Sequence, residues 1–336
     1  MRLGKLPPEL LARALGELVH RDPRVRLGPR PGEDAGIVDL GAATLVVTTD
    51  PITFVSEDLA WYVVQVNAND IAATGAEPAW LALTALLPPA AAERDVMALF
   101  AGLQAACESL GVEVITGHTE VTDAVTRPVL AGTMVGLAPA EGPVRSDGAR
   151  PGDALIVAGA VGVEGTAALA AEARAALIAA GLTAAQTHAA SSLLREPGIS
   201  VLNASRSLRR ACRPHALHDA TEGGVATAIR ELAEASAVGV RVDLDALPLL
   251  PITRGVCHAL DLDPLGLISS GCLLAAVAPE DAGPALARLH GEGILAARAG
   301  TFTRERTLIA TDDRGERPLP AFDRDELARY VEQRAG

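Results

Sequence analysis

Three polar residues interrupt an otherwise apolar segment between residues 59 and 74. Asn67, Asp70 and Thr74 are spaced i, i+3 and i+7, so a helix over this segment places them on one face. Burying a carboxylate costs free energy unless it is paired or binds a metal ion. Two interpretations stay open: this face hydrogen-bonds to a neighbouring loop, or Asp70 faces a cation and a phosphate. We favour the second.

Four aspartates occur where a rigid element would aim a side chain at a ligand. Each lies at a predicted strand end, on a helix face or in a glycine-rich turn before a helix: Asp34, Asp50, Asp70 and Asp219. One such residue alone would be interpreted as a cap or turn residue. Mg²⁺ is commonly held by one or two carboxylates together with waters and phosphate oxygens. The set of four therefore favours a Mg–ATP site.

A glycine series follows a predicted strand in the second half of the sequence. Its spacing, Gly159-x-x-Gly162-x-x-Gly165, differs from the G-x-G-x-x-G of dinucleotide-binding folds, and no acidic residue ends a second strand near position 185. The sequence also lacks the G-x-x-x-x-G-K-[ST] of P-loop enzymes and the G-x-S-x-G of serine hydrolases. These three classes are therefore excluded.

His118 follows a predicted strand and precedes Glu120 by two residues. A histidine in a loop is a surface or structural residue, or else a contact for a ligand or phosphate. The sequence leaves both open, and we retain His118 as a candidate.

Strands and helices interleave in both halves. In the first half we expect helices over 9–19, 59–74 and 93–110, and strands over 37–40, 44–49, 80–87, 112–116 and 129–137. In the second half we expect strands over 154–158, 238–242, 271–277, 295–299 and 307–311, and helices in the Ala-rich 166–192 and up to 235. Pro51 is expected to stop the second strand, and residues 117–120 to form a loop.

This order lacks strict β-α alternation, which predicts an α+β fold in each half. Residues 139–151 are rich in Gly and Pro and read as a linker. We therefore expect two domains, residues 1–150 and residues 151–336.

Composition limits the possible partners and surroundings. The 336 residues carry a net charge of −13 and no basic run, so nucleic acid and anionic membranes are poor candidates. Aromatic residues make up only 2% of the chain, so the core must be built from Ala, Val and Leu. The four cysteines are scattered without C-x-x-C, which favours reduced core thiols. With no signal-peptide pattern and no long apolar span, we expect a cytoplasmic protein.

Seven motifs, in order, resemble those of a known superfamily. Its N-terminal half is matched by Gly32-Glu33-Asp34-Ala35, Thr48-Thr49-Asp50, Asn69-Asp70-Ile71-Ala72 with Gly75-Ala76, and Gly117-His118-Thr119-Glu120. Its C-terminal half is matched by Gly159/Gly162/Gly165, Asp219-Ala220-Thr221-Glu222-Gly223-Gly224, and Ser270-Gly271. The superfamily comprises aminoimidazole ribonucleotide (AIR) synthetase, HypE, thiamine-monophosphate kinase and selenophosphate synthetase. Over residues 30–310 the chain looks most like the HypE branch and AIR synthase-related proteins.

The resemblance implies a two-domain fold and ATP-driven phosphoryl transfer, often to an amide-like oxygen. The N-terminal α/β domain would join its sheet to that of a second copy in a dimer barrel, and an α+β C-terminal domain would complete a cleft for ATP. The metal ligands would be Asp34, Asp50 and Asp70, and the catalytic residues Asp70, Asp219 and His118. The residues that bind ATP would be Asn67, Gly117, Thr119, Glu120, Gly159, Gly162, Thr221, Gly223 and Gly224.

Three departures from the HypE pattern bear on the acceptor. His118 stands where the pattern usually has Asp, Glu222 stands where Arg is common, and residues 332–336 contain no Cys. The tail thiol that accepts the carbamoyl group in HypE is thus missing from this sequence. We therefore expect activation of a separate small molecule or protein-borne group. The alternatives are a non-catalytic nucleotide-binding scaffold in a maturation complex and a thiamine-monophosphate kinase-like phosphotransferase.

Overall fold

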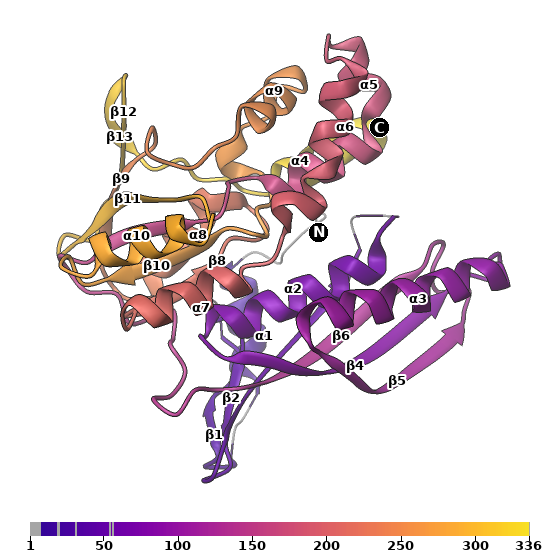
Figure 1. Cartoon of the computed structure of the whole chain (residues 1–336), viewed down its shortest axis with the longest axis horizontal. Coiled ribbons are helices and arrows are strands. Elements are labelled where there is room, and N and C mark those ends of the chain that lie inside the picture. Colours follow the sequence, from indigo (N-terminus) through magenta and orange to yellow (C-terminus); the bar gives the residue numbers. More distant parts are fainter. Residues whose placement is uncertain (1–7, 19–20, 31, 54, 56, 336) are drawn as a thin grey trace. The chain divides into compact units, whose positions relative to one another are not determined.

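The computed structural model describes residues 8–18, 21–30, 32–53, 55 and 57–335 (Figure 1). The chain divides into two compact units. The N-terminal unit contains Val19–Pro29 and Asp34–Pro143, and the C-terminal unit contains Met1–Leu18, Arg30–Glu33 and Val144–Gly336. Each unit is built on one sheet, and the two are described separately.

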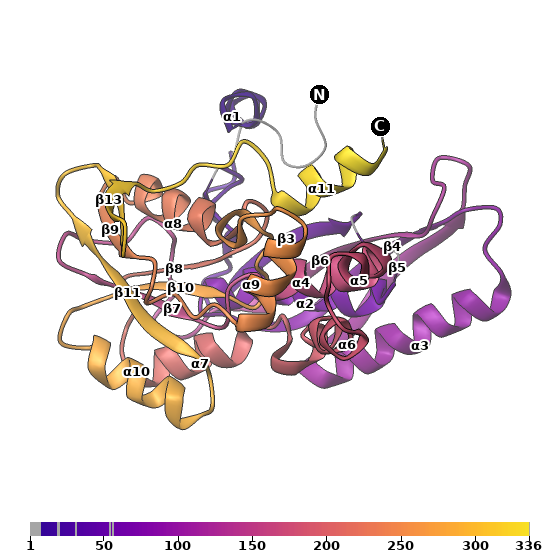
Figure 2. The same cartoon turned by 90° about the horizontal axis from the view of Figure 1, so that it is seen from above.

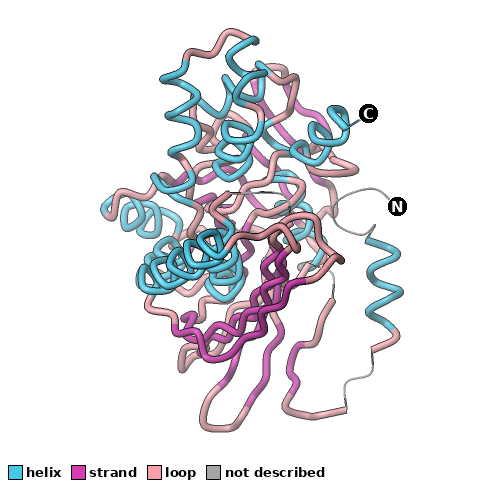
Figure 3. Tube along the Cα trace, turned by 90° about the vertical axis from the view of Figure 1, so that its right-hand side faces the viewer, coloured by secondary structure: helices cyan, strands magenta, loops and turns pink. Residues whose placement is uncertain are grey.

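The N-terminal unit is a six-stranded sheet with the order β1-β2-β3-β6-β4-β5. Its strands are β1 (Val25–Leu27), β2 (Gly36–Asp39), β3 (Thr44–Ile52), β4 (Glu77–Leu87), β5 (Glu113–Val121) and β6 (Val129–Leu137). Only β4 and β5 pair in parallel; the other pairs are antiparallel. The helices α2 (Leu59–Ala73) and α3 (Glu93–Leu110) lie on one side of these strands (Figure 3).

The helix α2 is the centre of this unit. It packs on β3, β4 and β6 and also against α3, and 13 of its residues are buried. A helix that is apolar nearly all round is stable only when it is buried in this way. Gly75, at φ +71°, follows the C-terminus of α2, a position where glycine adopts the left-handed conformation without strain. The expected helix 59–74 is confirmed, as are helix 93–110 and strand 129–137.

Two local predictions in this unit are wrong. Pro51 lies inside β3, opposite Ala131 of β6. Because β2 pairs with β3 only as far as Val47, Pro51 lies where β3 has one neighbour, and a missing N–H is tolerated there. Residues 117–120 belong to β5 and not to a loop, since they pair with residues 83–86 of β4.

The C-terminal unit is a seven-stranded sheet with the order β13-β12-β9-β11-β7-β10-β8. Its strands are β7 (Ala154–Ala158), β8 (Ala216–Asp219), β9 (Gly239–Asp243), β10 (Leu273–Val277), β11 (Ala296–Thr303), β12 (Leu308–Asp312) and β13 (Gly315–Pro318). The pairing of β9 with β12 is parallel and the rest is antiparallel. Both sheets are therefore mixed, and the predicted α+β class is confirmed.

Helices cover this second sheet on both faces: α8 lies on one and α7 and α10 on the other (Figure 2). The helices of the C-terminal unit are α1 (Pro8–Gly16), α4 (Val163–Glu172), α5 (Arg174–Ala179), α6 (Ala184–Ser192), α7 (Leu202–Ala211), α8 (Gly224–Ala235), α9 (Pro251–Ala259), α10 (Ala282–Gly291) and α11 (Glu326–Ala335). Two short helical turns are η1 (Leu194–Gly198) and η2 (Pro264–Gly266). Every residue of β7, β8 and β10 is buried, including those of β8, which is the edge strand of the sheet beside β10.

An ionic network holds the early segment Arg30–Glu33 in the C-terminal unit. The Arg30 guanidinium contacts Glu33 and lies 2.8 Å from the Asp147 carboxylate, and Arg145 also contacts Asp147. The Glu33 side chain is only 5% exposed, so its pairing with Arg30 offsets the cost of burying its charge. No helix in the described part of the chain is both long and apolar enough to cross a membrane.

Candidate functional site

Asp70 lies on α2 where it meets β3. Its Oδ2 accepts a hydrogen bond from the Thr48 hydroxyl at 2.5 Å, and Asp70 is 8% exposed. The sequence left open whether the polar face of α2 hydrogen-bonds to a neighbouring segment or faces a cation. The Thr48 contact is a hydrogen bond of the first kind, made to the strand β3. This hydrogen bond offsets part of the free-energy cost of burying the Asp70 side chain.

Asn67 fixes the main chain of Asp50. Its Oδ1 accepts the Asp50 N–H at 3.0 Å, and its Nδ2 donates to the Asp50 carbonyl at 3.3 Å and to the Val63 carbonyl at 2.8 Å. A Cβ on Gly132 would lie 2.7 Å from the same Nδ2, so glycine is needed for this approach. Asn67 therefore fixes the backbone of Asp50 through two hydrogen bonds from α2.

The Asp50 carboxylate itself has no hydrogen bond or ion pair with any described residue, and Asp50 is half-buried. A side chain on a fixed backbone, with its oxygens unused, is what a metal ligand requires. Thr74, in contrast, donates to the Ile71 carbonyl at 2.8 Å and belongs to the helix end.

The three predicted metal ligands do not form a preassembled cluster. Within the described residues of the N-terminal unit, no three carboxylate or imidazole groups bring ligand atoms within 4.8 Å of one another. Asp34 lies in the bend before β2 and is half-buried. Mg²⁺ often takes only one or two carboxylates and completes its shell with waters and phosphate oxygens, so a Mg²⁺ site does not require such a cluster.

His118, Thr119 and Glu120 are all exposed on the edge strand β5. His118 Nε2 lies 3.2 Å from the Glu120 carboxylate, and the two side chains are 68% and 49% exposed. Gly117 permits the pairing with β4, because a Cβ there would lie 2.6 Å from the Leu83 carbonyl oxygen. These contacts explain the segment as part of the sheet.

In the C-terminal unit, three glycine-rich turns converge at one edge of the sheet. Ala158 at the end of β7 and Asp219 at the end of β8 both lie opposite Leu273, the first residue of β10. The segments that adjoin these ends, residues 159–165, 220–224 and 264–272, therefore lie together. The structure thus groups the glycine motifs that the sequence shows only in order.

Close backbone contact explains the glycines of these turns. A Cβ on Gly159 (φ +99°) would lie 1.8 Å from the Gly271 carbonyl oxygen, and one on Gly224 (φ +68°) 2.4 Å from that of Leu265. The Gly162 N–H donates to the Ser269 hydroxyl at 2.8 Å. These contacts hold the three turns, residues 159–165, 220–224 and 264–272, against one another. We call the three turns together the rim.

Comparison with known proteins agrees with this architecture. The AIR synthase related protein N-terminal domain matches residues 32–138, and the corresponding C-terminal domain matches residues 150–313. Carbamoyl dehydratase HypE of Rhizobium leguminosarum bv. viciae is 31% identical over 268 residues, which cover 78% of this chain and 73% of the relative. The chain belongs to the AIR synthase-related family. The resemblance in the sequence motifs is confirmed.

Two solved structures of family relatives extend the likeness over almost the whole chain. The crystal structure of E. coli HypE, a hydrogenase maturation protein, has a TM-score of 0.75 at 24% identity and covers 96% of this chain and 98% of that one. The crystal structure of HypE in complex with ATP has a TM-score of 0.67 at 25% identity and covers 95% and 91%. The AIR synthase-related fold is therefore present in both units.

Two buried carboxyl groups beside the glycine turns were not singled out from the sequence. The pKa of Glu164 is raised to about 7, chiefly by burial and to a smaller degree by the charge of Glu222, against hydrogen bonds from Ser270 that lower it. Burial likewise raises the pKa of Asp325 to about 7, against two backbone hydrogen bonds that lower it. An acidic residue inside the glycine series, between Gly162 and Gly165, was the available signal for Glu164. Asp325 gave a weaker one, as a cap before the apolar Leu327 and Ala328.

Asp219 is 2% exposed at the end of β8, and its neighbour His218 lies 3.1 Å from the Glu231 carboxylate. Burial raises the pKa of the adjacent Cys272 thiol to about 12, with a further contribution from the charge of Asp219. Asp219 is thus a buried acid at the rim of the AIR synthase-related C-terminal unit.

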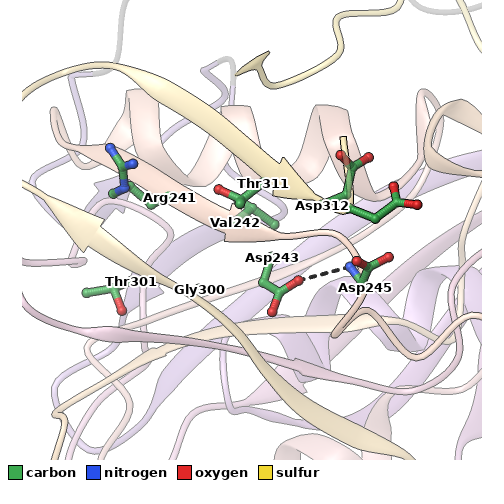
Figure 4. A pocket seen from close by; sticks show the side chains of 9 residues that line it. Arg241, Val242, Asp243, Asp245, Gly300, Thr301, Thr311 and Asp312 are labelled. Carbon is green, nitrogen blue, oxygen red and sulfur yellow. Dashed lines mark hydrogen bonds between the residues drawn. The ribbon is translucent and has the colours of Figure 1, made fainter. Parts of the chain in front are cut away.

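A separate pocket of about 600 Å³ lies over β9, β11 and β12 (Figure 4). Four carboxylates line it: Asp243, Asp245, Asp312 and Asp313. Arg241 at its margin contacts Glu316, and Asp312 is paired with Arg317 at 2.6 Å. Because this surface is acidic, it is unsuited to the phosphates of a nucleotide.

Proposed function

We propose that this chain is an ATP-dependent enzyme that transfers a phosphoryl group from Mg–ATP to an acceptor oxygen. The observation that carries the proposal is Asp50, whose main chain is fixed by Asn67 while its carboxylate has no partner among the described residues. ATP is chosen as the nucleotide because the structure of the related HypE has been solved in complex with ATP.

In this proposal Asp50 and Asp70 hold the metal ion, with Asp34 as a third ligand. A bound Mg²⁺ would neutralise phosphate charge and orient the phosphoryl group. Thr48 keeps the Asp70 carboxylate oriented, and Asn67 does the same for Asp50 through its backbone. Asp219 and His118 remain candidates for proton transfer. The nucleotide would be contacted by Gly117, Thr119, Glu120, Gly159, Gly162, Thr221, Gly223 and Gly224.

The relatives named carbamoyl dehydratase support an amide-like acceptor. Phosphorylation of an amide oxygen turns it into a leaving group, so that its loss as phosphate completes a dehydration. The cysteines of this chain are poorly suited to accept a carbamoyl group. Cys107, Cys257 and Cys272 are at most 2% exposed, and burial raises their pKa to about 11 or 12. Burial also raises the pKa of Cys212 to about 11. Since a thiolate is the reactive form, the acceptor is a group on another molecule.

Calorimetry of Mg–ATP binding tests the metal ligands. Asp50→Asn and Asp70→Asn should each weaken Mg-dependent affinity by about tenfold or more, because each removes one anionic ligand at constant shape. Asp123→Asn, on an exposed residue of the same unit, is the matched control. Unchanged affinity in both site variants would refute the assignment.

Phosphate release separates the enzyme from a non-catalytic nucleotide-binding scaffold. We expect slow release with ATP alone and stimulation by one class among amides, ribonucleotides and thiamine phosphate. Tight binding without any turnover across this panel would favour the scaffold.

A further inference from the structure

The segment before and within α11 crosses the glycine-rich turn at the start of α8. We call residues 319–329 the strap. The Arg230 side chain of α8 donates to the Leu319 carbonyl at 3.2 Å, and a Cβ on Gly266 would lie 2.4 Å from the Phe322 ring. Figure 2 shows this part of the chain between β13 and α11 passing over α8. The strap is thus packed on both α8 and η2.

Asp325 makes the contact between the strap and the turn. Its Oδ2 accepts the Gly223 N–H at 2.7 Å, while its Oδ1 accepts the Leu327 N–H at 2.7 Å. Asp325 is 6% exposed, so both bonds are shielded from water. One carboxylate therefore joins the beginning of α11 to the beginning of α8.

The Gly223 N–H that bonds to Asp325 belongs to a backbone conformation that few residues other than glycine adopt. Gly223 is the N-cap of α8 at φ +83°, and Gly224 follows at φ +68° and donates to the Thr221 carbonyl. Left-handed conformations at two successive residues are accessible mainly to glycine, which without an anchor also samples many others. An external acceptor on the Gly223 N–H selects one of them.

Further contacts keep the strap in place from the other side. Glu326 accepts the Asp263 N–H at 2.9 Å and pairs with Arg329 at 2.7 Å. Arg329 also donates to the Asp261 carbonyl. These contacts hold the chain next to Asp325 against residues 261–263, which precede η2.

We propose that Asp325 is a positioning residue that fixes the Thr221–Gly224 turn, so that the strap sets the affinity of the site for the nucleotide. This rests on the proposed function, in which the turn contacts ATP. Both glycine N–H groups already bond within the protein, so the turn acts through its shape and through the placement of Thr221 and Glu222. Asp325 itself does not touch the nucleotide.

Hydrogen exchange of the protein without nucleotide tests the positioning step. In Asp325→Asn we expect amides of residues 221–227 to exchange at least tenfold faster, because Asp325 accepts the two N–H groups on two different oxygens and asparagine has only one. Asp325→Ala should raise the exchange rates of the same amides further. Asp323→Asn, an exposed acid two residues away with the same charge change, should stay within twofold of the wild type.

Steady-state kinetics test the consequence for the nucleotide. Asp325→Asn should raise KM for Mg–ATP about tenfold and change kcat less than threefold, and Asp323→Asn should change neither. Exchange rates equal to the control, or faster exchange with an unchanged KM, would each overturn the proposal. If the wild type binds no ATP, the proposed function fails, and any effect confined to exchange identifies the strap as a structural anchor only.

Discussion

The Thr48 hydroxyl donates to the Asp70 carboxylate across 2.5 Å, which joins β3 to the buried helix α2. Thr48→Val removes this donor at nearly constant volume. We expect the free energy of unfolding to fall by about 1–3 kcal/mol, because a buried carboxylate loses one charge-assisted hydrogen bond. Mg–ATP affinity should fall with it. Thr48→Ser should restore both, as denaturation curves and calorimetry can check; a fully active, stable Thr48→Val protein would contradict this role.

Glu164 should make stability depend on pH. Its pKa, raised by burial from 4.5 to about 7, means that the folded state keeps a proton that the unfolded state loses. This contribution is fully present below pH 4.5 and is lost as pH rises to about 7. At pH 8, Glu164→Gln should therefore raise the free energy of unfolding by about 1–3 kcal/mol. At pH 4.5 it should change little.

Thermal melts at pH 4.5 and pH 8 measure this difference. Glu280→Gln, on an exposed residue of the same unit, is the control. A destabilised Glu164→Gln protein at pH 8 would show that the Glu164 carboxylate is needed in its ionised form.

Gly159 should tolerate no side chain. At φ +99° and with a Cβ only 1.8 Å from the Gly271 carbonyl oxygen, Gly159→Ala should cost on the order of 3 kcal/mol or more. Gly283→Ala in α10 meets no atom within 4 Å and should be neutral or stabilise by about 0.5 kcal/mol. Urea denaturation of the two proteins gives the comparison, and equal stabilities would contradict the tight packing of the turns.

We expect a homodimer formed through the N-terminal sheet. Along β6, alternate residues are buried on the side that faces α2, while Val129, Ala131 and Val135 are only half-buried. An apolar sheet face of this kind is typical of an interface. Val135→Glu should shift the protein from dimer to monomer in light scattering, and Met97→Glu, on exposed α3, should not. A monomeric wild type at micromolar concentration would refute the expectation.

Removal of residues 332–336 should leave phosphate release within a few-fold of the intact chain. It deletes the Arg324–Glu332 ion pair but keeps Asp325, Glu326 and Arg329. Removal of residues 322–336 takes the anchor as well and should raise KM for Mg–ATP. If the shorter deletion abolishes turnover while nucleotide still binds, the last residues are themselves part of the reaction.

Local sequence patterns were sufficient for the elements with strong apolar periodicity. The helices over 59–73 and 93–110 and the strand Val129–Leu137 were predicted almost to the residue, because each has a long pattern with clear ends. The strand Ala216–Asp219 was missed, since two of its four residues are His218 and Asp219. Pairing with β10 overrides their low strand propensity.

The site was predictable in its motifs but not in its contacts. Glycines 159 and 224 stand out in the sequence, whereas the reason for them is a set of close backbone contacts between turns that are far apart in the chain. The bond between Gly223 and Asp325 joins residues 102 positions apart, and no local pattern reports such a pair. Asn67 likewise looked like a ligand residue, and only the structure shows its amide bonded to the Asp50 backbone.

The C-terminal unit recruits Arg30–Glu33, while the N-terminal unit is nearly continuous over Asp34–Pro143. During synthesis on a ribosome, the first sheet can therefore form while the second half of the chain is still being made. The turn at Gly223 must wait until Asp325 has left the exit tunnel, about 100 residues after the turn itself. A nascent chain would thus carry a folded first unit for several seconds before the Gly223 turn gains its anchor.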